Sequence, residues 1–566
     1  MSKDKQKREE SGARGFISGV VVLSLSTMLV KVIGLAFKIP MLSFLGTEGM
    51  GYFNSAYEIY ALLCVIATAG LPVALSILVS SARARGDWAE IKRVFRIARL
   101  LFLALGALGT LAMLLFSRQI ANFIGNPDSY LSIIAIAPSL LFICLASALR
   151  GYCQGFGNMG PTALSQLIEA LSKLGFGILF AVIAIRKGYP VPTISAFAVL
   201  GITLGTLLSL IYLSAARRGR AYRPMRKAQS GKREGSALKK LVGIAFPITL
   251  GSLVIGLTRI IDMTLIMRRL QDIGVSIALS NKIYGAYTTL ALPVFSLIPA
   301  LITPVSMALV PQISAALEIN DRQTQKSVVE RAMRLTTIFS LPASMGVAAF
   351  SSPILSLLFS GQEEAVGISA PLLSWLGVSI VFSCLITTTN AILQSYKKVI
   401  LPIISMSVGV IVKLGVSYFL IGDPRFGALG APIGSLACNL TVTLINLWFM
   451  SAYSDCALSI KNVLIKPLAA SALAVGGALA VYIWTDAKMS GGHFPLMVAI
   501  LVAAAVYIAV SFCIGSITAE DVGLLPFGDR ILKHINKKNR YKKTAEEKND
   551  SQREENDVAE KGELRR

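Results

Sequence analysis

The chain is short of acidic residues and of histidine. Its 566 residues include 31 Asp and Glu against 55 Lys and Arg, and charged residues make up only 15% of the total. Soluble globular domains are about a quarter charged, so this composition, with a mean hydropathy of +0.66, excludes an ordinary soluble enzyme. Two histidines, His493 and His534, offer little for histidine catalysis or zinc binding. The composition predicts a polytopic membrane protein.

Sequence signals for several other functions are also missing. The seven cysteines are scattered without a C-x-x-C pair, so neither a disulfide framework nor a metal site is expected. No nucleotide motif of the G-x-x-x-x-G-K-[ST] kind occurs, which argues against ATP hydrolysis. The formal net charge of +24 comes from short loops and chain ends, so we expect no nucleic-acid partner. We therefore predict no catalytic residue, metal or cofactor.

The sequence consists largely of long apolar runs. A membrane span needs about 20 mainly apolar residues, and Lys and Arg collect in the cytoplasmic loops. The cation-rich loops here alternate with cation-poor ones, which predicts an all-α fold with both termini in the cytoplasm. Fourteen spans are predicted, at 16–45, 50–82, 94–117, 128–153, 160–185, 191–216, 241–267, 283–316, 332–360, 368–395, 399–421, 426–452, 463–485 and 494–516.

The apolar part of the sequence contains an internal repeat. The tripeptide Lys173–Gly175 recurs as Lys413–Gly415, and each copy lies inside an apolar stretch. A second similarity follows each tripeptide: residues 200–206 read L-G-I-T-L-G-T, and residues 429–435 read L-G-A-P-I-G-S. Six spans in each copy predict two parallel six-helix repeats around a central cavity, an arrangement typical of transporters. The predicted order is a basic cytoplasmic tail (1–15), an N-lobe (16–216), a basic linker (217–240), a C-lobe (241–453), an appended helix pair (463–516) and a disordered charged tail (517–566).

Lysines occur deep within the first predicted span. Lys31, Gly34 and Lys38 are three and four residues apart, which places them on one helix face. A charge near the bilayer centre costs about 2.5–3.5 kcal/mol on insertion scales, so two lysines on one stripe predict a water-filled cavity or a bound anion. Alternatively, they pair with acids such as Glu58 and hold helices together. Arg150 lies near the cytoplasmic end of its span, where snorkelling explains it.

Other charges within the spans could pair or could bind a ligand. Glu169 precedes Lys173 by four residues, the favourable order for a local ion pair. Arg259 and Asp262 are three residues apart and could also pair locally. Lys413 has no acid three or four residues away, so we predict an unpaired cation that faces a ligand.

Glycine and proline residues within the spans predict hinges, because proline removes a backbone hydrogen bond and bends a helix. The hinge candidates are Gly34, Pro40, Pro72 and Pro304.

Three stretches resemble a known family. Lys31–Gly34, Gly70–Ser76 and Leu309–Ser314 are similar to motifs of bacterial flippases in the multidrug, oligosaccharidyl-lipid and polysaccharide exporter superfamily, in the branch of stage V sporulation protein B and MurJ-like proteins. The resemblance implies two lobes that open alternately to either side of the bacterial cytoplasmic membrane. Its implied cargo is an undecaprenyl-pyrophosphate-linked saccharide, lipid II or a related precursor, carried from the inner to the outer leaflet.

The resemblance also implies roles for the charged residues. Cavity cations would bind the pyrophosphate, and the acids would be structural or coupling groups. The implied partners are the lipid-linked saccharide, membrane lipids and cell-wall synthesis proteins, with the membrane potential, sodium or protons as the driving force. The alternatives are a multidrug or cation exporter, which needs unpaired acids in the N-lobe, and a polyprenyl-sugar glycosyltransferase, which needs acids or histidines in large loops. The candidate residues are Lys31, Lys38, Lys413, Arg259 and Lys173 for the substrate, and Glu58, Glu169 and Asp262 for the acids.

Overall fold

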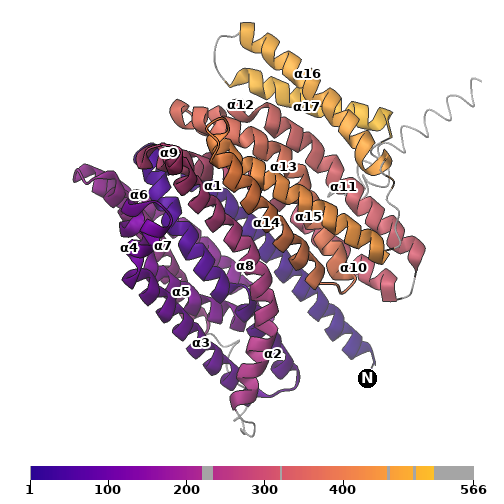
Figure 1. Ribbon diagram of the computed structural model, residues 1–566. Coiled ribbons are helices and arrows are strands. Elements are labelled where there is room, and N and C mark those ends of the chain that lie inside the picture. The colour runs from indigo at the N-terminus through magenta and orange to yellow at the C-terminus, as the bar shows by residue number, and fades with distance from the viewer. Residues whose placement is uncertain are drawn as a thin grey trace, which may run out of the picture. The chain divides into compact units, whose positions relative to one another are not determined.

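All the long elements of the structure are helices (Figure 1). The computed structural model describes residues 2–218, 234–318, 321–454, 459, 461–488 and 493–515. Within these ranges, 12 helical stretches are long and apolar enough to cross a membrane. The number rises to 13 if helices α11 (Arg322–Ala349) and α12 (Ser351–Leu358), bent by 83°, form one broken span. The prediction of an all-α polytopic membrane fold is confirmed.

The first two predicted spans lie in one long stretch of helix. Helix α1 (Ser2–Thr68) is followed after one residue by α2 (Gly70–Ala84), and the apolar stretch Ser26–Ala84 is 59 residues long. A single crossing needs about 20 residues. The helical path breaks at Gly46, whose φ of 64° lies in the left-handed region that glycine tolerates. Helix α1 already begins at Ser2, ahead of residue 16, where the first span was predicted to start.

The remaining helices follow the apolar runs closely. In the first half of the chain they are α3 (Trp88–Leu115), α4 (Ser117–Phe123), α5 (Tyr130–Gly155), α6 (Gly160–Arg186) and α7 (Val191–Ala216). In the second half they are α8 (Glu234–Asp272), α9 (Ile277–Ala286), α10 (Leu292–Glu318), α13 (Glu363–Ser395), α14 (Ile400–Ile421), α15 (Gly430–Ser454), α16 (Lys466–Lys488) and α17 (Phe494–Cys513). A π-helical turn, η3 (Tyr287–Ala291), joins α9 to α10.

The repeated glycines have matching packing roles in the two halves. A Cβ on Gly205 of α7 would lie 2.8 Å from the carbonyl oxygen of Glu169 on α6. A Cβ on Gly434 of α15 would lie 3.3 Å from the carbonyl oxygen of Lys413 on α14. In both halves, glycine therefore lets the next helix approach the backbone of the helix that carries the repeated lysine.

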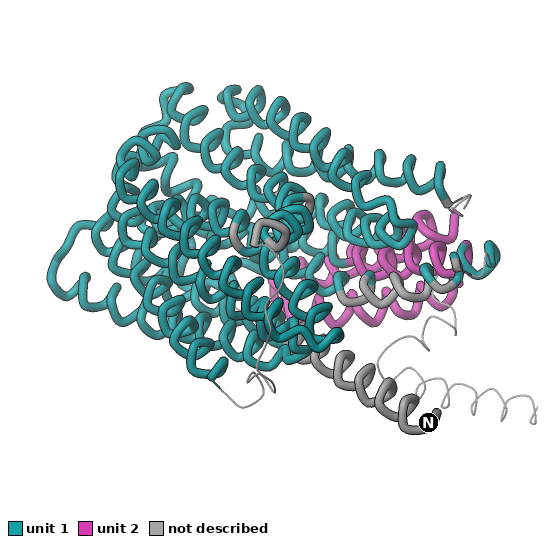
Figure 2. The backbone as a smooth tube through the Cα atoms, turned by 90° about the horizontal axis from the view of Figure 1, so that it is seen from below, with its two compact units in different colours: residues 1–325, 343–455 teal, residues 326–342, 456–566 magenta. Residues whose placement is uncertain are grey.

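The chain divides into two compact units (Figure 2). One comprises residues 1–325 and 343–455, and the other comprises residues 326–342 and 456–566. Both predicted lobes belong almost entirely to the first unit. Helices α16 and α17 pack against each other in the second unit, where the appended pair was predicted. Most of the predicted linker, 219–233, and the predicted disordered tail lie outside the described residues.

Candidate functional site

A cavity of about 720 Å³ with charged residues in a mainly apolar lining lies within the N-lobe. Helix α1 lines it with Lys31 and Tyr57, α5 with Arg150, and α6 with Glu169 and Lys173. The cavity therefore gathers charges from the consecutive helices α5 and α6 and from α1, which is far from both in the sequence. Charged side chains at this depth are costly unless they meet water, each other or a ligand.

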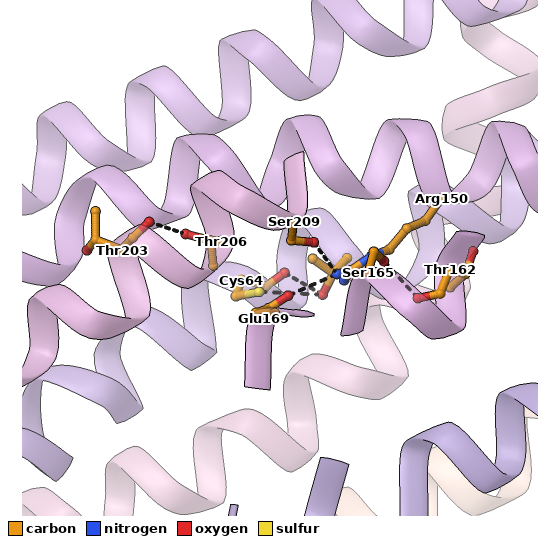
Figure 3. Close-up of polar contacts among 9 residues, drawn as sticks. Cys64, Arg150, Thr162, Ser165, Glu169, Thr203, Thr206 and Ser209 are labelled. Atoms are coloured by element: carbon orange, nitrogen blue, oxygen red, sulfur yellow. Dashed lines mark hydrogen bonds and ion pairs between the residues drawn. The ribbon is translucent and has the colours of Figure 1, made fainter. Parts of the chain in front are cut away.

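Arg150 organises one side of the cavity (Figure 3). Its Nη2 lies 2.9 Å from Oε2 of Glu169 and 3.1 Å from Oγ of Ser209, and its Nε lies 3.0 Å from Oγ of Ser165. These bonds tie α5 to α6 and α7. The side chains of Arg150 and Glu169 are 12% and 27% exposed, so the pair is partly desolvated and its geometry is fixed.

Lys173 is held by aromatic rings instead of by the predicted partner Glu169. Its Nζ lies 4.8 Å from the ring centroid of Phe37, 4.8 Å from that of Tyr57 and 5.7 Å from that of Phe53. An ammonium within about 6 Å of a ring centroid is attracted by the negative ring face. Such rings hold the ammonium without cancelling its charge, so Lys173 still has a net positive charge to offer an anion.

Lys31 reaches the same cavity from α1 with an exposed side chain. No ion pair involves it among the residues that the structure describes, and the predicted alternative partner Glu58 is engaged elsewhere. The Lys31 ammonium is therefore free to bind a ligand in the cavity.

Lys38 lies outside the cavity lining and joins the two lobes. Its Nζ donates to the carbonyl oxygen of Thr288 at 2.5 Å. Asn54 Nδ2 donates to the hydroxyls of Thr288 and Thr289, each at 2.9 Å. Both threonines belong to the π-helical turn η3, a type of helix defect often found at functional sites. In this structure, Lys38 therefore forms a contact between the two lobes.

The same interface continues through buried amides. Asn126 Nδ2 donates to Ser55 Oγ at 3.0 Å and to Asn281 Oδ1 at 2.8 Å. Asn281 Nδ2 donates in turn to the carbonyl oxygen of Glu48 at 2.8 Å. These contacts close the lobes against each other at the membrane end whose loops are predicted to face outward.

The prediction that Lys413 is unpaired was wrong. Its Nζ lies 2.7 Å from Oδ2 of Asp262, and the two side chains are only 8% and 10% exposed. Asp262 is 151 residues from Lys413 in the sequence and belongs to α8, which packs against α14. A sequence search for acids only three or four residues from Lys413, on the same helix, could not have found Asp262.

The local pair between Arg259 and Asp262 is also absent from the described contacts. Arg259 Nη1 instead lies 3.7 Å from Oε2 of Glu58, on α1. The Arg259 side chain is 57% exposed and that of Glu58 is 13% exposed. This long, open pair crosses between the lobes, so it is weaker than the buried pair of Lys413 and Asp262.

Nine charged residues were singled out within the spans, and their positive charges exceed their negative ones. Each of the three acids has a cation partner, in the ion pairs described above. Lys31, Lys38 and Lys173 have no carboxylate partner within the described part of the chain. The singled-out cations without a described carboxylate partner therefore all belong to the N-lobe.

The hinge candidates lie within helices. Gly34 and Pro40 are inside α1, whose non-helical residue is Gly46, and Pro72 follows the break between α1 and α2. Pro304 is inside α10. Their role as hinges stays a prediction.

Two cavity residues escaped the sequence reasoning. Arg150 was assigned to snorkelling, although it binds three side chains at the cavity wall. Gln166 lines the cavity, and its buried Oε1 has no hydrogen-bond partner. Gln166 is i+4 from Thr162 and i−3 from Glu169, so a count of all polar residues on that helix face could have found it.

Comparisons with known proteins place the chain in a family. Residues 16–317 match the family described as polysaccharide biosynthesis protein, and residues 247–419 match the family described as MatE. Stage V sporulation protein B of Bacillus subtilis (strain 168) is 27% identical over 452 residues, which cover 79% of this chain and 86% of that protein. Lipid II flippase MurJ of the same strain is 25% identical over 512 residues, covering 87% and 93%.

A solved structure has the same fold. The inward closed conformation of lipid II flippase MurJ covers 87% of this chain and 98% of its own, with a TM-score of 0.66 and 17% identity. Because the first family match spans more than half of the sequence, the chain belongs to the polysaccharide biosynthesis protein family, whose members are membrane transporters of the multidrug, oligosaccharidyl-lipid and polysaccharide exporter superfamily.

Proposed function

We propose that this transporter is an alternating-access flippase for an undecaprenyl-pyrophosphate-linked saccharide, lipid II or a related cell-envelope precursor. It would move this lipid from the inner to the outer leaflet of the bacterial cytoplasmic membrane, with both of its termini in the cytoplasm. One observation carries the proposal: Lys31 and Lys173 bring positive charge without a described carboxylate partner into one cavity.

The cavity suits a pyrophosphate and the sugar next to it. Ammonium groups make short, strong hydrogen bonds to phosphate oxygens, which Lys31 and Lys173 can supply from facing helices. Arg150, shared with Glu169, adds a fixed guanidinium at the wall. The free Oε1 of Gln166 can accept from a sugar hydroxyl. A volume of about 720 Å³ is within the usual range of about 300–1,000 Å³ for ligand pockets.

The similarity to flippases supports this choice of cargo. The relatives named stage V sporulation protein B and lipid II flippase MurJ each align over more than three quarters of this chain. The enzymes that make and use the lipid-linked precursor are proposed as partners, together with the surrounding lipids.

The membrane potential is the proposed driving force. With the cytoplasm negative, outward transfer of an anion is favoured by about 2.3 kcal/mol per charge per 100 mV. Lysines that moved with the headgroup would cancel part of this gain. Because Lys31 and Lys173 belong to the lobe itself, alternating access exposes them to each side with little net movement of their charge.

A multidrug or cation exporter is the second candidate, and the MatE match over residues 247–419 favours it. Binding of an organic cation needs an acid that is free to face the ligand. Glu58, Glu169 and Asp262 are each engaged by a cation. The charge of the cavity therefore favours an anionic cargo.

Competition in proteoliposomes tests the choice between these functions. Purified protein is reconstituted with a fluorescent undecaprenyl-pyrophosphate-linked sugar, and its transfer across the bilayer is followed by quenching from outside. Unlabelled undecaprenyl pyrophosphate should compete, whereas a cationic dye such as ethidium should not. Competition by the dye alone, or dye transport without lipid transfer, would reject the proposal. Depleting the protein in cells and identifying the lipid-linked precursor that accumulates on the inner leaflet would name the sugar.

A further inference from the structure

A second, larger cavity lies outside the proposed substrate site. It has a volume of about 910 Å³ and is lined by α3, α5, α7 and the residues just after α7. These helices pack side by side in the N-lobe (Figure 1). The lining is at the membrane end where α3 begins and α7 ends, which the cation-rich loops predict to be cytoplasmic.

The polar wall of this cavity is strongly basic. Lys92 and Arg99 are seven residues apart on α3, so they share a helix face two turns apart. Arg217 and Arg218 follow the end of α7. Among the described residues, none of those that line the cavity is acidic. The nearby acid Glu90 is already paired with Arg85 at 2.6 Å.

Three of these cations have no described partner. Lys92, Arg99 and Arg218 are exposed, and no hydrogen bond or ion pair of their side chains occurs within the described residues. Arg217 is held differently, because its guanidinium lies 4.2 Å from the ring centroid of Phe95 and 5.4 Å from that of Tyr152. The rings fix Arg217 at the rim without neutralising it.

The rest of the cavity is apolar and aromatic. Leu103, Leu145, Leu149 and Leu210 continue from the cations along the helices, and Leu103 is 42% exposed. Trp88 stands at the rim, where its amphipathic ring suits the membrane interface. A free phosphate would use the cations alone, whereas a phospholipid would use the cations for its headgroup and the leucines for its acyl chains.

We propose that this groove, defined by Lys92, Arg99, Arg217, Arg218 and its leucine wall, binds an anionic phospholipid from the inner leaflet. Basic pockets between helices on the cytoplasmic side are suited to anionic headgroups. The groove shares no lining residue with the cavity of Lys31 and Lys173, so the proposed lipid site is distinct from the proposed substrate site.

Lipid binding to the purified full-length protein tests the proposal. Native mass spectrometry in neutral detergent is used to titrate dioleoylphosphatidylglycerol, dioleoylphosphatidylcholine and inorganic phosphate. We expect saturable binding of phosphatidylglycerol only. Each of Lys92→Gln, Arg99→Gln and Arg218→Gln should weaken it by roughly fivefold. Arg96→Gln is the matched control, because Arg96 is exposed on the same helix but outside the groove, and it should change binding less than about twofold.

A second variant tests the apolar part of the groove. Leu145→Trp keeps every cation and fills the space beside them, so phosphatidylglycerol binding should fall although the charge is unchanged. Equal binding of phosphatidylcholine, full competition by inorganic phosphate, or equal losses in Arg96→Gln and Arg99→Gln would each overturn the proposal.

Discussion

Lys413 and Asp262 form a buried ion pair, with 2.7 Å between Nζ and Oδ2. The pair joins α14 to α8 within the C-lobe. Lys413 is the counterpart of Lys173 in the sequence repeat, but Lys173 is surrounded by aromatic rings and not by a carboxylate. The two copies therefore use the same lysine differently. In the C-lobe the charge is neutralised and structural, and in the N-lobe it remains available.

Removing one member of the buried pair should destabilise the protein more than removing both. Breaking a buried pair leaves an unpaired charge and costs about 3–5 kcal/mol, whereas an apolar replacement of both partners is close to neutral. We expect Lys413→Met to lower the thermal unfolding temperature in detergent strongly, and Lys413→Met with Asp262→Leu to recover most of the loss. Equal losses in the single and double variants would show that the two charges are not coupled.

Closure of the lobes should depend on Gly285. A Cβ at this position would overlap the carbonyl oxygen of Thr47 and would lie 2.8 Å from the backbone nitrogen of Gly51. Gly285→Ala should therefore shift the equilibrium toward states in which this end is open. Spin labels at Asp128 and Ala278 would report a longer distance between the lobes.

The control for this substitution is Gly367→Ala on α13, where an added Cβ meets nothing within 4 Å. It should leave the distance distribution unchanged. The same distribution for Gly285→Ala as for the unsubstituted protein would contradict the proposed role of this crossing.

The two partners of the cavity ion pair should have opposite effects on an anionic ligand. Glu169→Gln frees the guanidinium of Arg150 and should strengthen binding of undecaprenyl pyrophosphate. Arg150→Gln leaves Glu169 without its cation and should weaken binding, by about tenfold for a loss of about 1.4 kcal/mol. Isothermal titration of purified variants measures both. Binding of undecaprenyl pyrophosphate that weakens in Glu169→Gln and strengthens in Arg150→Gln would contradict an anion site beside this pair.

Lys38 should affect the transport rate more than the affinity. Its ammonium bonds to the carbonyl oxygen of Thr288 across the lobes and does not line the cavity. Lys38→Met should lower the maximal rate of lipid transfer severalfold, because it changes the balance between lobe arrangements, while the dissociation constant changes less than about twofold. A loss of affinity as large as that of Lys31→Gln would place Lys38 in the substrate site.

Sequence patterns predicted most of the fold but only part of the site. Apolar runs located the spans because the bilayer requires long apolar helices, and two lysines on one face of α1 predicted a water-filled cavity or a bound anion. The partners of the charges were mostly mispredicted. Asp262 meets Lys413 and Glu58 meets Arg259 through contacts between helices far apart in the chain. Spacing within one helix reveals partners only three or four residues away.

The break at Gly46 was also hidden from the apolar pattern. Proline at 40 seemed the better candidate for a bend, yet α1 stays helical there and departs from helical geometry six residues later. Neighbouring helices can satisfy the carbonyl that a proline frees in a membrane span, so the sequence alone does not fix where the bend falls.

Binding of undecaprenyl pyrophosphate to the Lys31→Gln, Lys173→Gln double variant tests the proposed cationic cavity most directly. Hydrogen bonds to charged groups contribute about 1.5–3 kcal/mol each, so the dissociation constant should rise by a factor of at least about 100. Lys187→Gln, an exposed lysine outside the cavity lining, is the control and should bind like the unsubstituted protein. An unchanged dissociation constant in a folded double variant would contradict the cavity's role in binding an anionic lipid headgroup.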